Sequence, residues 1–353
     1  MGFLLWVCMR SIIVPILLTA YLGLGVAQAQ SASRTIAAPT LPDFTSFVVT
    51  RPENNRLVPI TLEEAGHALK AYDVVLVGEH HGHIANHLAQ MALLRSIHRA
   101  TPQLALSMEQ FERDHQSRVD DYLAGVIGEQ TLVDGGGWKN YAQSYRPLVE
   151  YAKEHRLPVI AANAPRSIVR CVGREGPDYL KTLSADKRKL VAAELHVEDG
   201  IYKQKFLKFM RGDAAHEDAT DTSDKAKRAR IENSFAAQMT RDDTMAESIA
   251  NFLGRHPGIK VFHITGSFHV ADRLGTLERL SARAPNLKVA LIMPLPLNPS
   301  DLAGGISQDA KGADYVILIR REPEPHVTDG EKKAAHMKQA GRYRSAGSAG
   351  CKS

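Results

Sequence analysis

The chain has 353 residues, of which 44% are hydrophobic, and its formal net charge is +5. Most of the positive excess lies in residues 320–353, which hold eight Lys or Arg and four Asp or Glu, so a nucleic-acid-binding groove in the rest of the chain is not indicated. Three cysteines are too few for a disulfide framework, and a packed core has to stabilise the fold.

The first 29 residues have the pattern of a secretory signal peptide. An apolar run from Ser11 to Val26 ends at the small-residue sequence Ala27-Gln28-Ala29, which fits a cleavage site. The run is shorter than the roughly 20 residues that a membrane-spanning helix needs. Because Cys8 precedes the apolar run, no cysteine is in place for a lipid anchor. We expect an exported protein, periplasmic or secreted, without stable membrane insertion.

Short apolar runs bounded by turn residues alternate with helical patterns along the chain. This alternation predicts an α/β fold, a mostly parallel sheet with flanking helices. The predicted strands are Val74–Val77, Leu104–Met108, Val159–Ala162, Ile259–Ile264, Leu287–Met293 and Tyr315–Ile319. The predicted helices include Ile84–Ala100, Ser184–Leu195, Ile201–Arg211 and Ile231–Leu253.

The connection between the third and fourth predicted strands is too long for a simple crossover. We therefore expect a helical insertion at about residues 165–255 that caps one end of the sheet. The α/β domain as a whole is predicted over residues 30–321. Residues 322–353 contain Pro, Gly, Ser and charged side chains without apolar periodicity, which predicts a disordered tail.

Polar side chains follow four of the predicted strands, where ligands of open parallel sheets bind. They are Glu79 and His81 after the first strand, Glu109 after the second, Asn163 after the third and His269 after the fourth. The two histidines each belong to a Gly-x-x-His sequence, in which the glycine permits a tight turn. We predict one functional site there, with solvated loop histidines as the alternative.

The two glutamates have three roles open to them. Each of Glu79 and Glu109 can bind a metal, act as a general base or orient a histidine. A charged group that ends a buried strand is costly unless it is paired, which favours a place in the site. His83 and His87 are spaced as in many zinc-binding helices, although polar surface is the favoured explanation for them.

Aromatic residues are dense before the third predicted strand: Trp138, Tyr141, Tyr145 and Tyr151. They either pack a helix or line the binding surface of a flat ligand. In the second case a phenol is available as an iron ligand, as in tyrosine-ligated haem proteins.

Five stretches resemble the ChaN-like haem-binding uptake proteins of the Tiki superfamily. They are Val75–Asn86, Ser107–Phe111, Ala162–Arg166, Ala236–Ala250 and Ile264–Gly275, within about residues 44–297. The resemblance implies a haem-binding protein of bacterial iron acquisition, a homodimer, and an outer-membrane haem transport system as partner. It implies ferric haem at the carboxyl edge of the sheet, near Tyr141, Tyr145, Glu79, Glu109, Asn163 and Arg166.

The wider superfamily also includes metal-dependent hydrolases and proteases with two Gly-x-x-His motifs and a Glu and an Arg between them. His81, Glu109, Arg166 and His269 follow this order. The alternative is therefore a hydrolase with Glu79, Glu109 and Arg166 as catalytic residues. His81 and His269 are the predicted ligands of a Mn, Co, Zn or Fe ion in that case.

Overall fold

The computed structural model describes residues 40–54, 56–134, 138, 140–211, 225–298, 301, 311–345 and 351. The predicted signal peptide lies outside them. None of the described helices is long and apolar enough to cross a membrane. The strands are β1 (Phe47–Glu53), β2 (Arg56–Pro59), β3 (Val74–Glu79), β4 (Leu104–Glu112), β5 (Val159–Asn163), β6 (Lys260–Gly266), β7 (Val289–Leu297) and β8 (Tyr315–Arg320).

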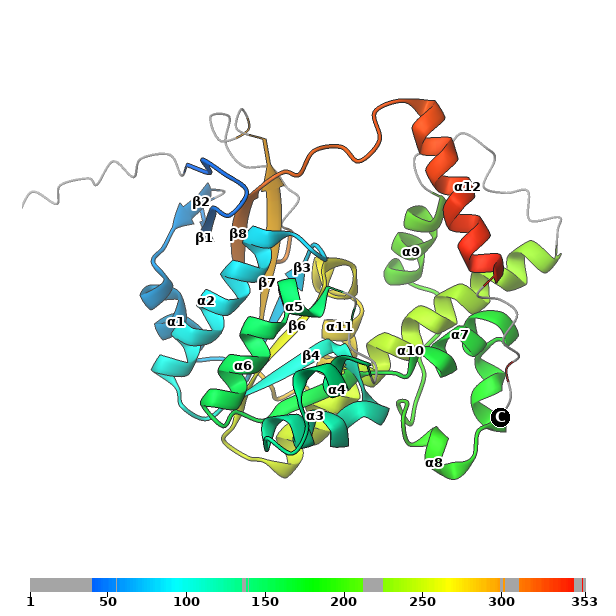
Figure 1. Ribbon diagram of the computed structural model, residues 1–353, viewed down its shortest axis with the longest axis horizontal. Helices are drawn as coiled ribbons and strands as arrows, with labels where there is room; N and C mark the ends of the chain where they lie inside the picture. Colours follow the sequence, from blue (N-terminus) through cyan, green and yellow to red (C-terminus); the bar gives the residue numbers. More distant parts are fainter. Residues whose placement is uncertain are drawn as a thin grey trace, which may run out of the picture. The chain divides into compact units, whose positions relative to one another are not determined.

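These strands form one sheet in the order β2-β1-β8-β7-β3-β6-β4-β5 (Figure 1). Strands β3 to β8 pair in parallel, as predicted, whereas β1 and β2 add an antiparallel edge that was not predicted. In β1 only two of seven residues are buried, so it lacks the continuous apolar run of a central strand. The order places the carboxyl ends of β3, β6 and β4 side by side.

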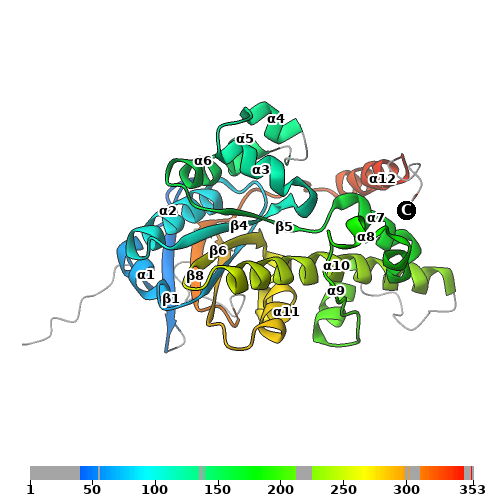
Figure 2. The same cartoon turned by 90° about the horizontal axis from the view of Figure 1, so that it is seen from below.

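Helices cover both faces of the sheet (Figure 2). The first face packs against α1 (Leu62–Leu69), α2 (Ile84–Ala100) and α6 (Arg146–Glu154), and the other against α10 (Lys225–Arg255) and α11 (Thr276–Arg283). Alternate residues of β3 join opposite layers, because successive side chains of a strand point to opposite faces. The other helices are α3 (Gln116–Leu123), α4 (Glu129–Asp134), α5 (Tyr141–Ser144), α7 (Arg166–Glu175), α8 (Ala185–Arg188), α9 (Ile201–Arg211) and α12 (Asp329–Ser345).

The segment between β5 and β6 is helical, as predicted. The second half of α10 packs on the sheet, and α7, α8 and α9 lie around the half that extends beyond it (Figure 2). Helix α8 ends at Arg188, earlier than predicted. The Arg188 guanidinium binds the carbonyls of residues 191–193, and the Ala192 amide donates to Thr244 Oγ1 on α10. These contacts replace the helical hydrogen bonds of that segment.

The prediction of a disordered tail is wrong for residues 329–345, which form α12. Thr328 and Glu331 form reciprocal hydrogen bonds between side chain and backbone at its start, a capping box. The helix has strong helix formers but little apolar surface, so apolar periodicity did not reveal it. Beyond the helix, Cys351 forms a disulfide with Cys171 of α7.

Candidate functional site

His81, Glu109 and His269 meet at the carboxyl ends of the adjacent strands β3, β4 and β6. The Glu109 Oε1 atom lies 3.6 Å from Nε2 of His269. A Cβ atom on Gly266 would lie 2.8 Å from Nε2 of His81 and 3.6 Å from Oε2 of Glu109. The lack of a side chain at Gly266 therefore lets the His81 ring approach the strand backbone at this end of β6. The buried Glu109 carboxylate lies between two imidazoles that are far apart in sequence.

The Glu79 carboxylate orients His81. Its Oε1 atom accepts from Nδ1 of His81 at 2.7 Å and from the Tyr145 hydroxyl at 2.7 Å. Gln90 and Gln110 also donate to this fully buried carboxylate. Of the three roles open to Glu79, the structure supports orientation of a histidine, because protein donors occupy both oxygens. The His81 side chain is 42% exposed.

His269 is oriented by Asp242 of α10. Its Nδ1 atom donates to Oδ1 of Asp242 at 2.7 Å. The buried Asp242 carboxylate also accepts from the hydroxyls of Tyr202, at 2.7 Å, and Thr276, at 2.8 Å. The sequence analysis missed Asp242. The sequence nevertheless points to this residue, because an acidic side chain lies midway between Met239 and Met245 on the apolar stripe of a helix. A charge at such a position is costly without a partner.

The three charged groups at the centre shift one another's pKa values. Burial by itself would raise the pKa of the Glu109 carboxyl. The positive charges of His269 and His81 act against burial, as do hydrogen bonds from the Gly266 amide and the Thr265 hydroxyl. Together they lower this pKa to about 2. Burial lowers the pKa of His81 and His269. For His81, the hydrogen bond to Glu79 and the charge of Glu109 more than offset burial, so its pKa is raised. For His269, the charges of Asp242 and Glu109 do the same, and its pKa is raised as well. The site favours a carboxylate between two imidazolium ions.

Tyr141 and Tyr145 do not face the site as predicted. Both rings belong to the main hydrophobic cluster, with 2% and 0% exposure. The Tyr141 hydroxyl is buried without a partner among the described residues, and that of Tyr145 donates to Glu79. Burial raises the pKa of both phenols. In this structure both phenols take part in packing, the first of the two roles that the sequence left open.

Two further predicted residues have structural contacts. The buried Asn163 side chain donates to the Glu109 carbonyl and accepts from the Ala164 amide, so it braces the end of β4 and is not open to a ligand. Arg166 is 63% exposed, and its Nε atom lies 3.5 Å from Glu112 Oε1. It lies at the rim of the site, outside the Glu109 centre.

His83 and His87 do not form a zinc pair. The Nε2 atom of His83 lies 2.8 Å from the Arg320 carbonyl, and His87 hydrogen-bonds to Gln90 and to the Gly82 amide. Both imidazoles are buried. Among the described residues, one group of three side chains brings possible metal-ligand atoms within 4.8 Å of one another. It consists of Glu112, Asp114 and His115. The donor atoms of His81, Glu109 and His269 are not grouped so closely.

Apolar and aromatic side chains flank the two histidines. The Trp138 ring lies 4.7 Å from the ring of His81, and Phe268 lies 4.9 Å from Phe209 of α9. Directly after the His81 turn, α2 leaves two large apolar side chains about half exposed, Ile84 and Leu88. The site thus combines a buried polar centre with an apolar rim, which suits an amphipathic ligand.

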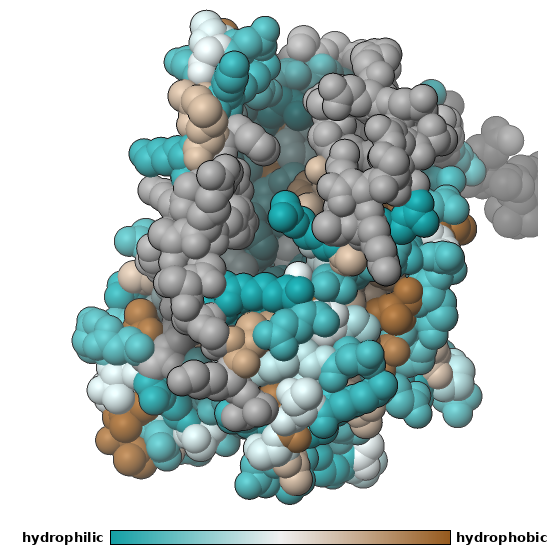
Figure 3. Space-filling view, turned by 90° about the vertical axis from the view of Figure 1, so that its right-hand side faces the viewer, coloured by the Kyte–Doolittle hydropathy of each residue, from teal (hydrophilic) through white to brown (hydrophobic). Residues whose placement is uncertain are grey.

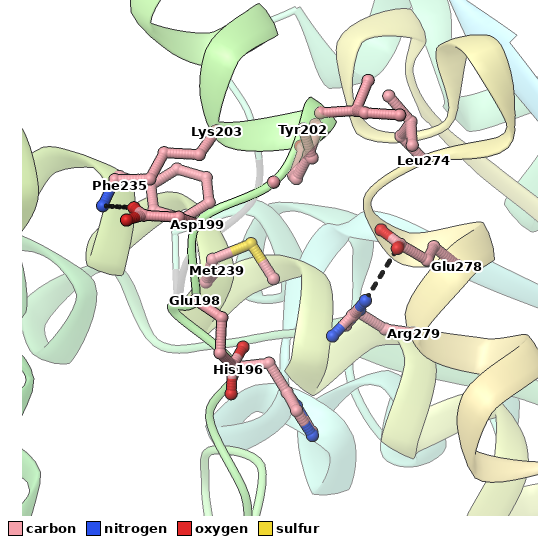
Figure 4. Close-up of a pocket in the computed structure, with 12 residues that line it drawn as sticks. His196, Glu198, Asp199, Tyr202, Lys203, Phe235, Met239, Leu274, Glu278 and Arg279 are labelled. Carbon is pink, nitrogen blue, oxygen red and sulfur yellow. Dashed lines mark hydrogen bonds and ion pairs between the residues drawn. The ribbon is translucent and has the colours of Figure 1, made fainter.

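A pocket of about 210 Å³ adjoins the His269 side of the site (Figure 4). Tyr202 lines it and also hydrogen-bonds to Asp242, so this ring stands between the pocket and His269. The cations of the pocket, Lys203 and Arg279, pair with acidic neighbours within it. Figure 3 shows a hollow on the face that it presents, and the visible walls of the hollow are mainly hydrophilic.

Three known proteins are similar to this chain, and one solved structure among them shares its architecture. A solved structure of ChaN of Campylobacter jejuni with cofacial haem has 15% sequence identity and a TM-score of 0.55, covering 80% of this chain and all of that one. The type III effector HopBA1 has 10% identity and a TM-score of 0.42, with 80% and 100% covered. RETICULATA-RELATED 5, a chloroplastic protein of Arabidopsis thaliana, is 30% identical over 96 residues, which cover 25% of this chain and 12% of that protein.

The likeness to the ChaN structure shows the fold. The sequence profile of the family described as "Haem-binding uptake, Tiki superfamily, ChaN" matches residues 66–280, more than half of the chain. The matched range extends from α1 into α11 and includes His81, Glu109 and His269. The chain belongs to the ChaN family of haem-binding uptake proteins in the Tiki superfamily.

Proposed function

We propose that this protein binds ferric haem at the carboxyl edge of its sheet, with Nε2 of His81 as the iron ligand, and that it serves iron uptake after export. His81 would bind iron as the neutral imidazole, so haem binding would release its Nε2 proton. The observation that carries the proposal is the His81 imidazole. Its ring is partly exposed, its Nδ1 atom is held by Glu79, and no protein atom forms a hydrogen bond with Nε2 among the described residues. A carboxylate on the far nitrogen is the usual partner of a metal-binding histidine.

The surroundings of His81 fit a porphyrin better than a bare ion. Trp138 lies beside the imidazole, and the exposed faces of Ile84 and Leu88 follow it in the chain. Haem brings its own four equatorial nitrogens, so one protein ligand suffices, whereas a bare ion needs three or four. Bound haem would supply the iron cargo for uptake, and the protein would hold it away from water and from other ligands.

The test is haem titration of the purified protein. We expect a shifted Soret band for the wild type, its loss in His81→Gly, and its return when imidazole is added to that variant. His80→Ala is the matched control, because His80 is the neighbouring exposed imidazole and should leave the spectrum unchanged. An unchanged spectrum in His81→Gly would refute His81 as the ligand. Absence of haem binding by the wild type would refute the function.

Acid–base hydrolysis is the second candidate, favoured by the two imidazoles that flank Glu109 with a carboxylate on each Nδ1 atom. This arrangement can move protons in both directions. His269→Ala separates the two functions. Hydrolysis of ester substrates would be lost in this variant, whereas the iron ligand of the proposed haem site would remain. The expected result is that the purified wild type hydrolyses no ester above background.

A further inference from the structure

The turn that follows β4 brings three possible metal ligands together. Ligand atoms of Glu112, Asp114 and His115 all lie within 4.8 Å of one another. The Nδ1 atom of His115 lies 3.8 Å from Oδ1 of Asp114, which is too long for a hydrogen bond. Two ligands of a tetrahedral zinc ion lie roughly 3.4 Å apart, so small side-chain rotations would close this set on an ion.

The His115 imidazole gives a second, independent observation. Its Nδ1 atom is buried and has no hydrogen-bond partner among the described residues. The side chain is 20% exposed, so this nitrogen belongs to a packed turn. A buried polar atom without a partner costs free energy. An ion between this nitrogen and the neighbouring carboxylates would remove that cost, because an ion fits where a water molecule does not.

Contacts on both sides hold the turn in place. On one side the Arg113 guanidinium donates to the Ser248 hydroxyl of α10. On the other, the Gln116 side chain donates to the Val159 carbonyl and accepts from the Ala161 amide, both of β5. The two residues between Arg113 and Gln116 are therefore held on a fixed backbone. Ligands that are held in this way lose less entropy when they bind.

Glu112 offers one of its two carboxylate oxygens. Its Oε2 atom accepts from the Arg166 amide at 2.9 Å, which fixes the carboxylate at the start of α7. Its Oε1 atom lies 3.5 Å from Nε of Arg166, longer than a good charge-assisted hydrogen bond. The Arg166 side chain is 63% exposed, so an ion at Oε1 can displace it into solvent at little cost.

We propose that Glu112, Asp114 and His115 bind a divalent transition-metal ion, for which Zn²⁺ is the best match. One imidazole and two carboxylates suit zinc, whereas Mg²⁺ and Ca²⁺ prefer oxygen ligands alone. Three protein ligands leave a coordination position open to water. Glu112 follows Glu109 by three residues on β4, but the inference does not depend on haem binding, because its ligands are separate from the proposed iron ligand.

The experiment is calorimetric titration of the purified, metal-free protein with Zn²⁺ and with Mg²⁺ at neutral pH. We expect the wild type to bind Zn²⁺ at this turn and to bind Mg²⁺ far more weakly. His115→Ala and Asp114→Asn should each weaken Zn²⁺ binding about tenfold or more, because even the loss of a residue that orients a ligand costs that much. His67→Ala, at an exposed histidine of α1, is the matched control.

Two further measurements sharpen the assignment. Arg166→Gln should strengthen Zn²⁺ binding severalfold, because it removes the cation that competes for Oε1 of Glu112. Zn²⁺ should raise the unfolding temperature of the wild type and of His67→Ala more than that of His115→Ala. The unfolding curves without metal also show whether each variant folds.

Four results would overturn the proposal: no Zn²⁺ binding by the wild type, equal binding of Mg²⁺, unchanged Zn²⁺ affinity in both His115→Ala and Asp114→Asn, or weaker binding in Arg166→Gln. Loss of Zn²⁺ in His81→Gly with no change in His115→Ala would also overturn it, and would assign the ion to the His81 centre. Haem titration is a separate measurement, so either proposal can fail while the other stands.

Discussion

At the scale of single residues, the site depends on one buried carboxylate between two imidazoles. The pKa of Glu109 is lowered from its ordinary 4.5 to about 2, so its contribution to stability is present above pH 4.5 and is lost as pH falls toward 2. The pKa values of His81 and His269 are raised above 6.5, so their contribution is present below pH 6.5 and is lost as pH rises through the raised values.

We therefore predict that the haem-free protein is most stable between about pH 4.5 and 6.5. The Glu109 shift corresponds to about 3 kcal/mol. Glu109→Gln should flatten the dependence of the unfolding temperature on pH, since neither imidazolium retains this partner. Glu154→Gln, at an exposed carboxylate of α6, is the control. A Glu109→Gln profile as steep as that of the wild type would contradict the coupling of these groups.

At the scale of elements, the approach of two strand ends depends on Gly266. A Cβ at this position would lie 2.8 Å from Nε2 of His81, closer than carbon and nitrogen tolerate. We predict that Gly266→Ala destabilises the protein by about 1–3 kcal/mol and weakens haem binding, because the imidazole must move. Gly254→Ala, in α10 where an added Cβ meets no atom, should be neutral or stabilising.

The double variant Gly266→Ala with His81→Ala supplies the decisive measurement. If the clash with His81 causes the loss, the second substitution should recover most of the stability that the first one removed. Additive unfolding free energies would place the effect elsewhere in the turn.

Much of the fold was predictable from local patterns. Buried parallel strands have continuous apolar runs, and α2 and α9 have the predicted bounds because their sequences favour helix along their whole length. Edge strand β1 and helix α12 were missed because neither buries a continuous apolar surface. The strand order was not predictable, since pairing of β3 with β6 depends on contacts between residues almost two hundred positions apart.

The site was predictable in part for the same reason. His81, Glu109 and His269 follow apolar runs, and the rule that ligands bind at strand ends identified them. The partners that orient them, Asp242 and Tyr202, come from the helical insertion and carry no motif that relates them to His269. The role of the tyrosines before β5 could not be decided from the sequence, because composition does not distinguish an aromatic core from an aromatic binding surface.

At the scale of the whole molecule, the disulfide between Cys171 and Cys351 joins the end of the chain to the helical insertion. The sequence analysis did not predict this bond, because it took the cysteines to be too few for a disulfide framework. The cross-link spans 180 residues of sequence, so it restricts the unfolded chain strongly. Chain entropy gives about 5 kcal/mol as the upper value for a loop of this size.

We predict that Cys351→Ser lowers the free energy of unfolding by several kcal/mol, at most about 5. Reduction of the wild type should reproduce the loss, and reduction of the variant should change nothing further. Without residues 1–29, which contain Cys8, the oxidised protein should have no reactive thiol after denaturation. Trypsin should cut at Lys332 and Lys333 faster once the bond is broken. Removal of residues after Arg321 should match Cys351→Ser in stability, because the described side chains of α12 are almost all exposed and the segment acts through its covalent link. A truncated chain as stable as the oxidised wild type would show that the disulfide adds nothing.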